Sequence, residues 1–161
     1  MIYRVEYQEY MLSCDGGRNE DWPVWDEATP LFGDFNSLDD AVCAAEEEAE
    51  KDVIELCTNT RCGNGTIARN VYMITAYTED DYGELAPCDY NGVETDGYSR
   101  DYNAVDALDC HPDIKRAWEK AYRSYCGFLD YEDNNYWGFA EALEEELGED
   151  WEALPYIKRV Y

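Results

Sequence analysis

The chain has 161 residues, of which 38 are Asp or Glu and 12 are Lys or Arg, so its formal net charge is -26 at pH 7. With 45% hydrophobic and 15% aromatic residues, this composition excludes a disordered acidic tail and indicates a folded protein. The charge repels nucleic acid and anionic membrane surfaces, which disfavours direct binding to either.

The first residues predict a strand over Ile2–Tyr10, because Tyr3, Val5 and Tyr7 alternate with polar residues. This stretch lacks the basic start and apolar run of a signal peptide, and no run of about 18 apolar residues follows. We therefore expect a protein of the host-cell cytoplasm, with no membrane span.

The seven cysteines are odd in number and scattered, which favours reduced thiols over a disulfide framework. Leu31–Phe35 is a further candidate for a short strand.

A long acidic helix is predicted over Ser37–Leu56. Ser37 with Asp40 three residues later is typical of a capped helix start. One face is apolar, with helical spacing of Leu38, Ala41, Val42, Ala45, Ala49, Val53 and Leu56. The other faces carry Lys51 and eight carboxylates: Asp39, Asp40, Glu46, Glu47, Glu48, Glu50, Asp52 and Glu55. Over about 28 Å of helix this is one negative charge per about 3.5 Å, close to the ~3.4 Å along one strand of duplex DNA. The alternative is an acidic helix that only faces water.

The middle of the chain predicts the rest of a sheet. Val71–Tyr77 is apolar on both faces, as expected for a central strand. Glu84–Tyr90 follows a turn and predicts an antiparallel partner, which Pro87 limits to an edge. The dipeptide at 91–92, Asn-Gly, is typical of a hairpin turn, and Tyr98–Asp109 reads as a connector.

The C-terminal third predicts helices. Pro112 suits the first position of a helix. The outer face of this helix carries a basic patch of Lys115, Arg116, Lys120 and Arg123. We expect the patch to pair with acidic elements of the same chain and relieve their repulsion. A last helix is expected to begin at Asn134 or Asn135 and end at Gly148, before a short strand in Tyr156–Tyr161.

These elements predict an α+β fold, with a small, mainly antiparallel sheet, the acidic helix packed on it, and a C-terminal helical part. The connector is the best candidate boundary, which gives an α/β part at 1–100 and a helical part at 101–161, or one compact domain.

Few patterns point to catalysis or to a metal. His111 is the one histidine, and no nucleophile signature accompanies it and Cys110. Cys57 and Cys62 would add zinc ligand types to this pair, but no C-x2-C spacing occurs. Phosphate-cradling glycine motifs are absent, and no carboxylate pair stands out. We expect no enzyme, no cofactor and no bound metal.

In size, acidity and lack of a catalytic pattern, the chain resembles the small inhibitors of phages and mobile elements that mimic nucleic acid, such as anti-restriction and anti-CRISPR proteins. The resemblance implies a DNA or RNA mimic that evades host defence. Its partner would be a basic nucleic-acid-binding protein, namely a CRISPR effector, a restriction enzyme or a nuclease, whose basic groove it occupies. The alternative is an immunity protein or antitoxin that neutralises a basic nuclease toxin. Halophilic adaptation would also explain the charge, although the 15 Tyr and 7 Cys fit it poorly.

The expected partner-binding residues are carboxylates of the two acidic helices and of the segment before the second, with one aromatic anchor. They are Asp39, Asp40, Glu46, Glu47, Glu48, Glu50, Asp130, Glu132, Asp133, Glu141, Glu144, Glu145 and Trp137. Further candidate anchors, for which ordinary packing is the alternative, are Trp22, Trp25, Tyr131 and Tyr136.

Overall fold

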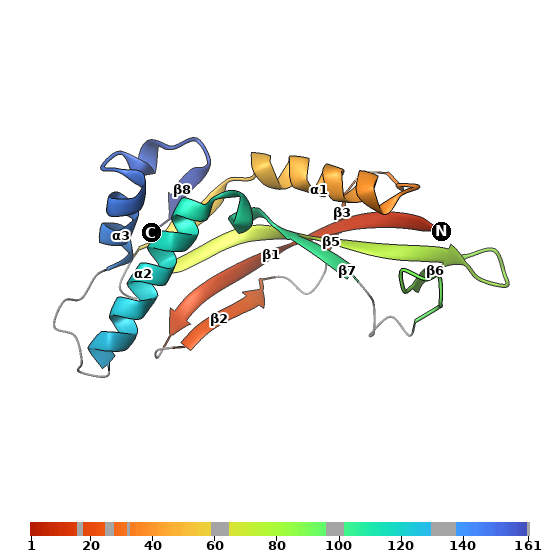
Figure 1. Cartoon of the computed structure of the whole chain (residues 1–161), viewed down its shortest axis with the longest axis horizontal. Helices are drawn as coiled ribbons and strands as arrows, with labels where there is room; N and C mark the ends of the chain where they lie inside the picture. Colours follow the sequence, from red (N-terminus) through yellow and green to blue (C-terminus); the bar gives the residue numbers. More distant parts are fainter. Residues whose placement is uncertain are drawn as a thin grey trace.

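The computed structural model of the chain describes residues 1–15, 18–24, 28–31, 33–58, 65–95, 102–129 and 138–160 (Figure 1). Within these ranges, eight strands form one mixed, mostly antiparallel sheet, accompanied by three α-helices. The fold is α+β, as the sequence predicts. Strands from both predicted parts of the chain belong to this sheet.

Two long strands form the spine of the sheet. β1 (Ile2–Asp15) and β5 (Thr66–Glu79) pair antiparallel over almost their whole length. Val5 of β1 and Ile74 of β5 lie opposite each other and are buried, so the predicted alternation is confirmed. Both strands extend beyond their predicted bounds, because polar residues such as Arg69 also lie in the pairing. The central position predicted for the apolar stretch of β5 is confirmed.

Shorter strands line both edges of this spine. β1 pairs antiparallel with β2 (Arg18–Pro23) and β3 (Thr29–Pro30). The other edge, along β5, carries β4 (Ile54–Cys57), β7 (Tyr102–Asp106) and β6 (Leu85–Cys88), all antiparallel. β8 (Ile157–Val160) pairs parallel with β4. The predicted return strand after β5 and the predicted C-terminal strand are therefore confirmed.

Two predictions about strands are wrong. The described residues of the segment Leu31–Phe35 form no strand, because Phe35 makes only an isolated bridge to Tyr3. The predicted connector Tyr98–Asp109 contains β7, which continues into the 3-10 helix η2 (Ala107–Cys110). β7 forms because it pairs with β5, and its five residues alone carry little pattern that would predict a strand.

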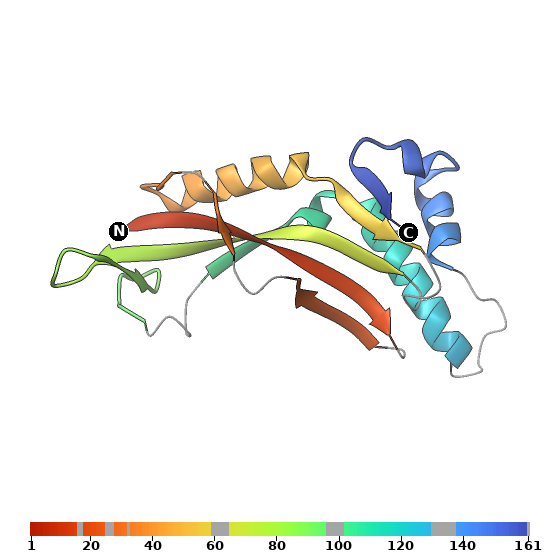
Figure 2. The ribbon, with the colours of Figure 1, turned by 180° about the vertical axis from the view of Figure 1, so that it is seen from behind.

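α1 (Leu38–Lys51) lies along one face of the spine (Figures 1 and 2). It begins where predicted, since the Ser37 side chain accepts a hydrogen bond of 3.1 Å from the backbone N–H of Asp40. Its packed face consists of three fully buried alanines, Ala41, Ala45 and Ala49. These small side chains let the helix lie close to the sheet.

The predicted extension of this helix to Leu56 is wrong. The helix ends at Lys51, Asp52 adopts an extended conformation, and β4 begins at Ile54. Leu56 is buried as expected, but in a strand, while Val53 is 47% exposed. Pairing of β4 with β5 and β8 outweighs the helical spacing of these residues.

α2 (Pro112–Leu129) and α3 (Phe139–Leu147) lie together at one end of the sheet (Figures 1 and 2). Trp118 and Phe139 join the two helices edge to face, with ring centroids 5.2 Å apart. The start of α2 at Pro112 and the end of α3 at Gly148 are confirmed. The start of α3 at Asn134 or Asn135, which lie outside the described residues, is wrong, because Gly138 is its N-cap. A second 3-10 helix, η3 (Trp151–Ala153), precedes β8. None of the helices in the described ranges has the length and apolar character to span a bilayer.

Candidate acidic interaction surface

The outward face of α1 is acidic. Its five exposed carboxylates fall within about 120° of arc at 100° per residue, opposite the alanine stripe. They are Asp39, Asp40, Glu46, Glu47 and Glu50. Near the middle of this arc stands Cys43, an exposed free cysteine. We call this set of five carboxylates the acidic face.

α1 keeps the average charge spacing of the longer predicted helix when Glu48 is counted with the acidic face. The helix has 14 residues and is therefore about 21 Å long, so its six carboxylates give one per about 3.5 Å and the five of the acidic face give one per about 4.2 Å. Among the described residues, only Glu48 of these six pairs with a cation, Lys51, at 3.4 Å. The other five carboxylates remain available to a partner.

The two predicted helix carboxylates that lie beyond Lys51 have structural contacts instead. The Tyr72 hydroxyl donates a hydrogen bond of 2.6 Å to Asp52, and Glu55 lies 3.4 Å from Lys158 on the neighbouring strand. Burial raises the pKa of Asp52, and the bond from Tyr72 only partly offsets this. Burial and then the Asp52 charge raise the pKa of the Tyr72 phenol. The pair joins the end of α1 to β5.

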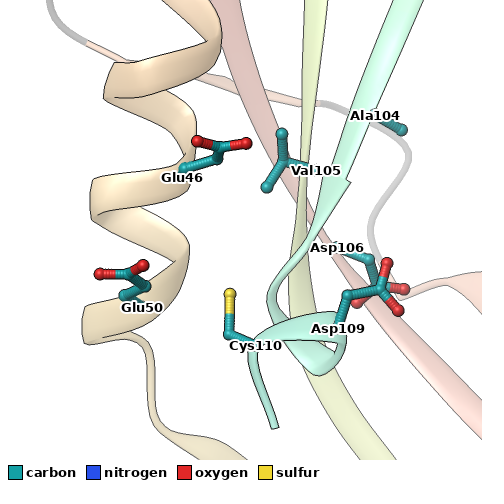
Figure 3. Close-up of a pocket in the computed structure, with 7 residues that line it drawn as sticks. All are labelled: Glu46, Glu50, Ala104, Val105, Asp106, Asp109 and Cys110. Atoms are coloured by element: carbon teal, nitrogen blue, oxygen red, sulfur yellow. The ribbon is translucent and has the colours of Figure 1, made fainter. Parts of the chain in front are cut away.

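A groove of about 360 Å³ separates α1 from β7 and η2 (Figure 3). Glu46 and Glu50 lie on its α1 side, while Asp109 and Cys110 come from η2. Burial raises the pKa of the Cys110 thiol, and nearby carboxylates, Glu50 first among them, raise it further. The thiol therefore stays protonated, in contrast to an activated nucleophile.

Asp106, which also lines the groove, is neutralised by the buried Arg69. The Arg69 guanidinium makes two hydrogen bonds of 2.7 Å to Asp21 of β2 and two of 3.0 and 2.8 Å to Asp106 of β7. Burial alone would lower the pKa of Arg69, but the bonds to these carboxylates outweigh it and raise the pKa. One feature of the sequence indicates this network, namely an arginine within the mostly apolar central strand.

The basic patch of α2 pairs within the protein, as predicted. Lys115 lies 2.5 Å from Asp109, Arg116 pairs with Asp113 and Glu146, and Lys120 pairs with Glu145. Arg123 has a side chain outside the described set. Since Asp109 is paired, Glu46 and Glu50 are the unpaired carboxylates of the groove.

The predicted partner-binding residues of α3 therefore differ from those of α1. Glu145 is already bound to Lys120, and the Glu141 carboxylate lies against Gly138 at the start of its own helix. Glu144 is exposed. Four further candidates lie outside the described residues: Asp130, Glu132, Asp133 and Trp137. The structure thus gathers the α1 candidates on one surface and places the described α3 candidates on another element.

Of the other proposed aromatic anchors, the structure describes only Trp22. It lies on β2, opposite Met11, and is 39% exposed. Trp25, Tyr131 and Tyr136 are outside the described ranges.

His111, which follows Cys110 in the sequence, packs against an aromatic ring. The His111 ring stacks on Tyr156, with centroids 4.3 Å apart and planes within 5°, and burial lowers its pKa. Cys57 is buried, and Cys62 lies outside the described residues. In the part of the chain that the structure describes, no group of three or more His, Cys, Asp or Glu residues is arranged to hold a metal.

Comparisons of the chain with protein-family models, with curated proteins and with solved structures found no match. What the protein does is therefore inferred from its charge and geometry.

Proposed function

We propose that this protein inhibits a nucleic-acid-binding protein of host defence, such as a CRISPR effector or a restriction enzyme, by placing the acidic face of α1 in its basic groove. The observation that supports this proposal is the row of six carboxylates on α1, whose average spacing of about 3.5 Å is close to that of the phosphates of one DNA strand. Five of the six pair with no cation among the described residues. The helix is held on the sheet by buried alanines, so the charges keep their spacing when the partner binds.

Pairing elsewhere in the molecule strengthens the case for α1. The cations of α2 are bound to nearby carboxylates, at distances within ordinary ion-pair range. Those carboxylates are engaged inside the protein, whereas Asp39, Glu47 and Glu50 are not. The acidic face of α1 therefore keeps its charge available for the cations of a basic partner.

The groove beside α1 provides a recess next to these carboxylates that a partner side chain could enter. A Lys or Arg side chain of the partner that entered it would approach Glu46 and Glu50 from the side. Each such exposed pair contributes only about 0.2–1 kcal/mol, because solvent screens it. Binding therefore depends on the carboxylates collectively, and their field speeds the encounter at low salt.

Cys43 allows the partner to be captured at the proposed surface. A benzophenone attached to this thiol, with the labelled site verified by peptide mapping, should cross-link the partner upon irradiation in host lysate. The captured protein should be one that binds DNA or RNA. Capture only of proteins without nucleic-acid affinity would contradict the proposal.

Substitutions on α1 then test the charge. Asp39→Asn with Glu46→Gln, Glu47→Gln and Glu50→Gln should slow association with the captured partner by about ten-fold at low salt and flatten its salt dependence. A control with the same net charge changes four exposed acids that belong to no proposed binding surface: Glu94→Gln, Glu119→Gln, Glu149→Gln and Asp150→Asn. The control should associate nearly as fast as the wild type. Equal slowing by both variants would mean that only net charge matters, and α1 would not be the site.

A further inference from the structure

Three of the four arginines whose side chains the structure describes are held in one recurrent way, Arg116 being the exception. At each of these three sites the guanidinium pairs with a carboxylate and also lies over an aromatic ring, at 5.0, 5.9 and 5.5 Å from the ring centre. The sites are Arg4 with Asp34 and Tyr77, Arg69 with Asp21, Asp106 and Tyr10, and Arg159 with Glu152 and Trp151. Carboxylate and ring together suit the planar guanidinium, which forms directed hydrogen bonds and also stacks.

The turn between β5 and β6 presents the same two groups without an arginine. Tyr82 is 91% exposed, so no described side chain covers its ring. Asp81 and Glu84 beside it are also exposed. The sequence contains no Lys or Arg from position 70 to 99. This turn lies at the end of the sheet opposite α2 and α3 (Figures 1 and 2).

The backbone of this turn is fixed before any partner arrives. The Asp80 carboxylate accepts hydrogen bonds of 2.9 Å from the backbone N–H groups of Tyr82 and Glu84. Gly83, with φ of 79°, completes the turn, and the Asp80 N–H donates to the Glu84 carbonyl at 2.7 Å. Binding at this turn would therefore order few groups besides the Tyr82 side chain, which keeps the entropic cost low.

We propose that the Tyr82 turn binds an exposed arginine of the partner protein. The guanidinium stacks on the Tyr82 ring while Asp81 or Glu84 accepts its hydrogen bonds, as at the three internal sites. Lysine fits less well, because its ammonium is strongly hydrated and has no plane to stack. The identity of the partner rests on the proposed function, and the turn would make that inhibitor select a groove rich in arginine over one rich in lysine.

The arginine preference can be measured without the partner. The full-length protein, labelled with 15N, is titrated at low ionic strength with capped octa-arginine or capped octa-lysine, and the Tyr82 amide shift is followed by NMR. Both peptides also gather on α1, so the readout is taken at the turn. The Tyr82 shift should reach half-saturation at about two- to five-fold lower octa-arginine than octa-lysine concentration.

Variants decide whether the ring causes the preference. Tyr82→Phe should keep it, whereas Tyr82→Ala, followed at the Asp81 amide, should bind both peptides equally. Leu85→Ala, which removes another exposed apolar side chain of the same hairpin, should keep it. Equal binding of both peptides by the wild type, or a preference that survives Tyr82→Ala, would overturn the inference.

These outcomes are separable from those for α1. If the arginine preference is absent while the α1 charge variant still slows association with the partner, only the assignment of the Tyr82 turn fails. If the preference is present while that variant associates as fast as the wild type, the proposed role of α1 fails and the arginine site remains.

Discussion

Arg69 shows how a very acidic protein makes use of one buried cation. Its side chain is 3% exposed, and its four hydrogen bonds join β2 and β7 to the central strand β5. The two carboxylates it binds would otherwise face each other across the sheet surface. The guanidinium thus converts a repulsion into a connection between strands.

Replacing Arg69 by Met should lower the free energy of unfolding by about 2–4 kcal/mol, because Asp21 and Asp106 lose their shared partner. Urea unfolding measures the change. Arg4→Met is the control, since its ion pair with Asp34 is largely exposed and should cost below about 1 kcal/mol. Equal losses in the two variants would show that burial does not strengthen the Arg69 network.

His111 gives the fold a pH dependence of known sign. Burial lowers its pKa below the ordinary value of 6.5. At a pH between the lowered pKa of the folded state and the ordinary 6.5 of the unfolded state, the unfolded chain binds more protons than the folded one. The free energy of unfolding therefore falls as pH drops through 6.5 and is unaffected well above it. The chain has no other histidine, so this contribution can be isolated.

His111→Phe keeps a ring against Tyr156 and removes the titration. The variant should be about as stable as the wild type at about pH 8, and increasingly more stable than it as pH falls below about 6.5. The difference in unfolding free energy between the two proteins, measured across this range, cancels the shared titration of the carboxylates. A difference that does not change with pH would contradict the burial of His111.

At the scale of elements, the sequence predicts best what local interactions decide. The side-chain cap at Ser37, the proline at the start of α2 and Gly148 at the end of α3 act within one turn, and all three are confirmed. The predicted end of the acidic helix is wrong because Val53 and Leu56 fit helical spacing as well as the residues of α1 do. Pairing with β5, beyond an intervening loop, and with β8, about 100 residues later, makes this segment a strand.

The same distinction applies to the candidate site. The exposed acids of α1 follow from helical spacing alone and could be predicted. The groove could not, because its second wall is formed by β7 and η2. Nor could the Arg69 network, whose partners Asp21 and Asp106 are 48 and 37 positions away. Which of the predicted acids are neutralised, such as Glu145, depends on the packing of α2 against α3.

Gly65, which immediately precedes β5, lies where β4 and α3 come close to the chain. Its φ of 124° strains any other residue, and an added Cβ would lie 2.7 Å from the Cys57 carbonyl and 2.8 Å from the Phe139 ring. Gly65→Ala should therefore lower the free energy of unfolding by more than about 2 kcal/mol. Gly92→Ala, which has a similar backbone constraint but open space, should cost about 1 kcal/mol. Equal costs in thermal or urea unfolding would show that α3 does not pack against this strand.

At the scale of the molecule, acids outnumber the cations that could pair with them. Among the described residues, the cations of α2 are paired, while the acidic face of α1 and the Tyr82 turn carry acids without such partners. Self-repulsion among unpaired acids costs stability. A basic partner would remove this cost, so the protein would gain stability upon binding it.

Competition between the inhibitor and nucleic acid for the captured partner tests the central claim most directly. The affinity of that partner for its own DNA or RNA is measured at increasing inhibitor concentration. If α1 occupies the nucleic-acid groove, the apparent Kd for nucleic acid should rise in proportion to free inhibitor, without a plateau. If the apparent Kd is unchanged or levels off while the partner is saturated with inhibitor, both ligands bind at once, and the account of α1 as a mimic of nucleic acid is wrong.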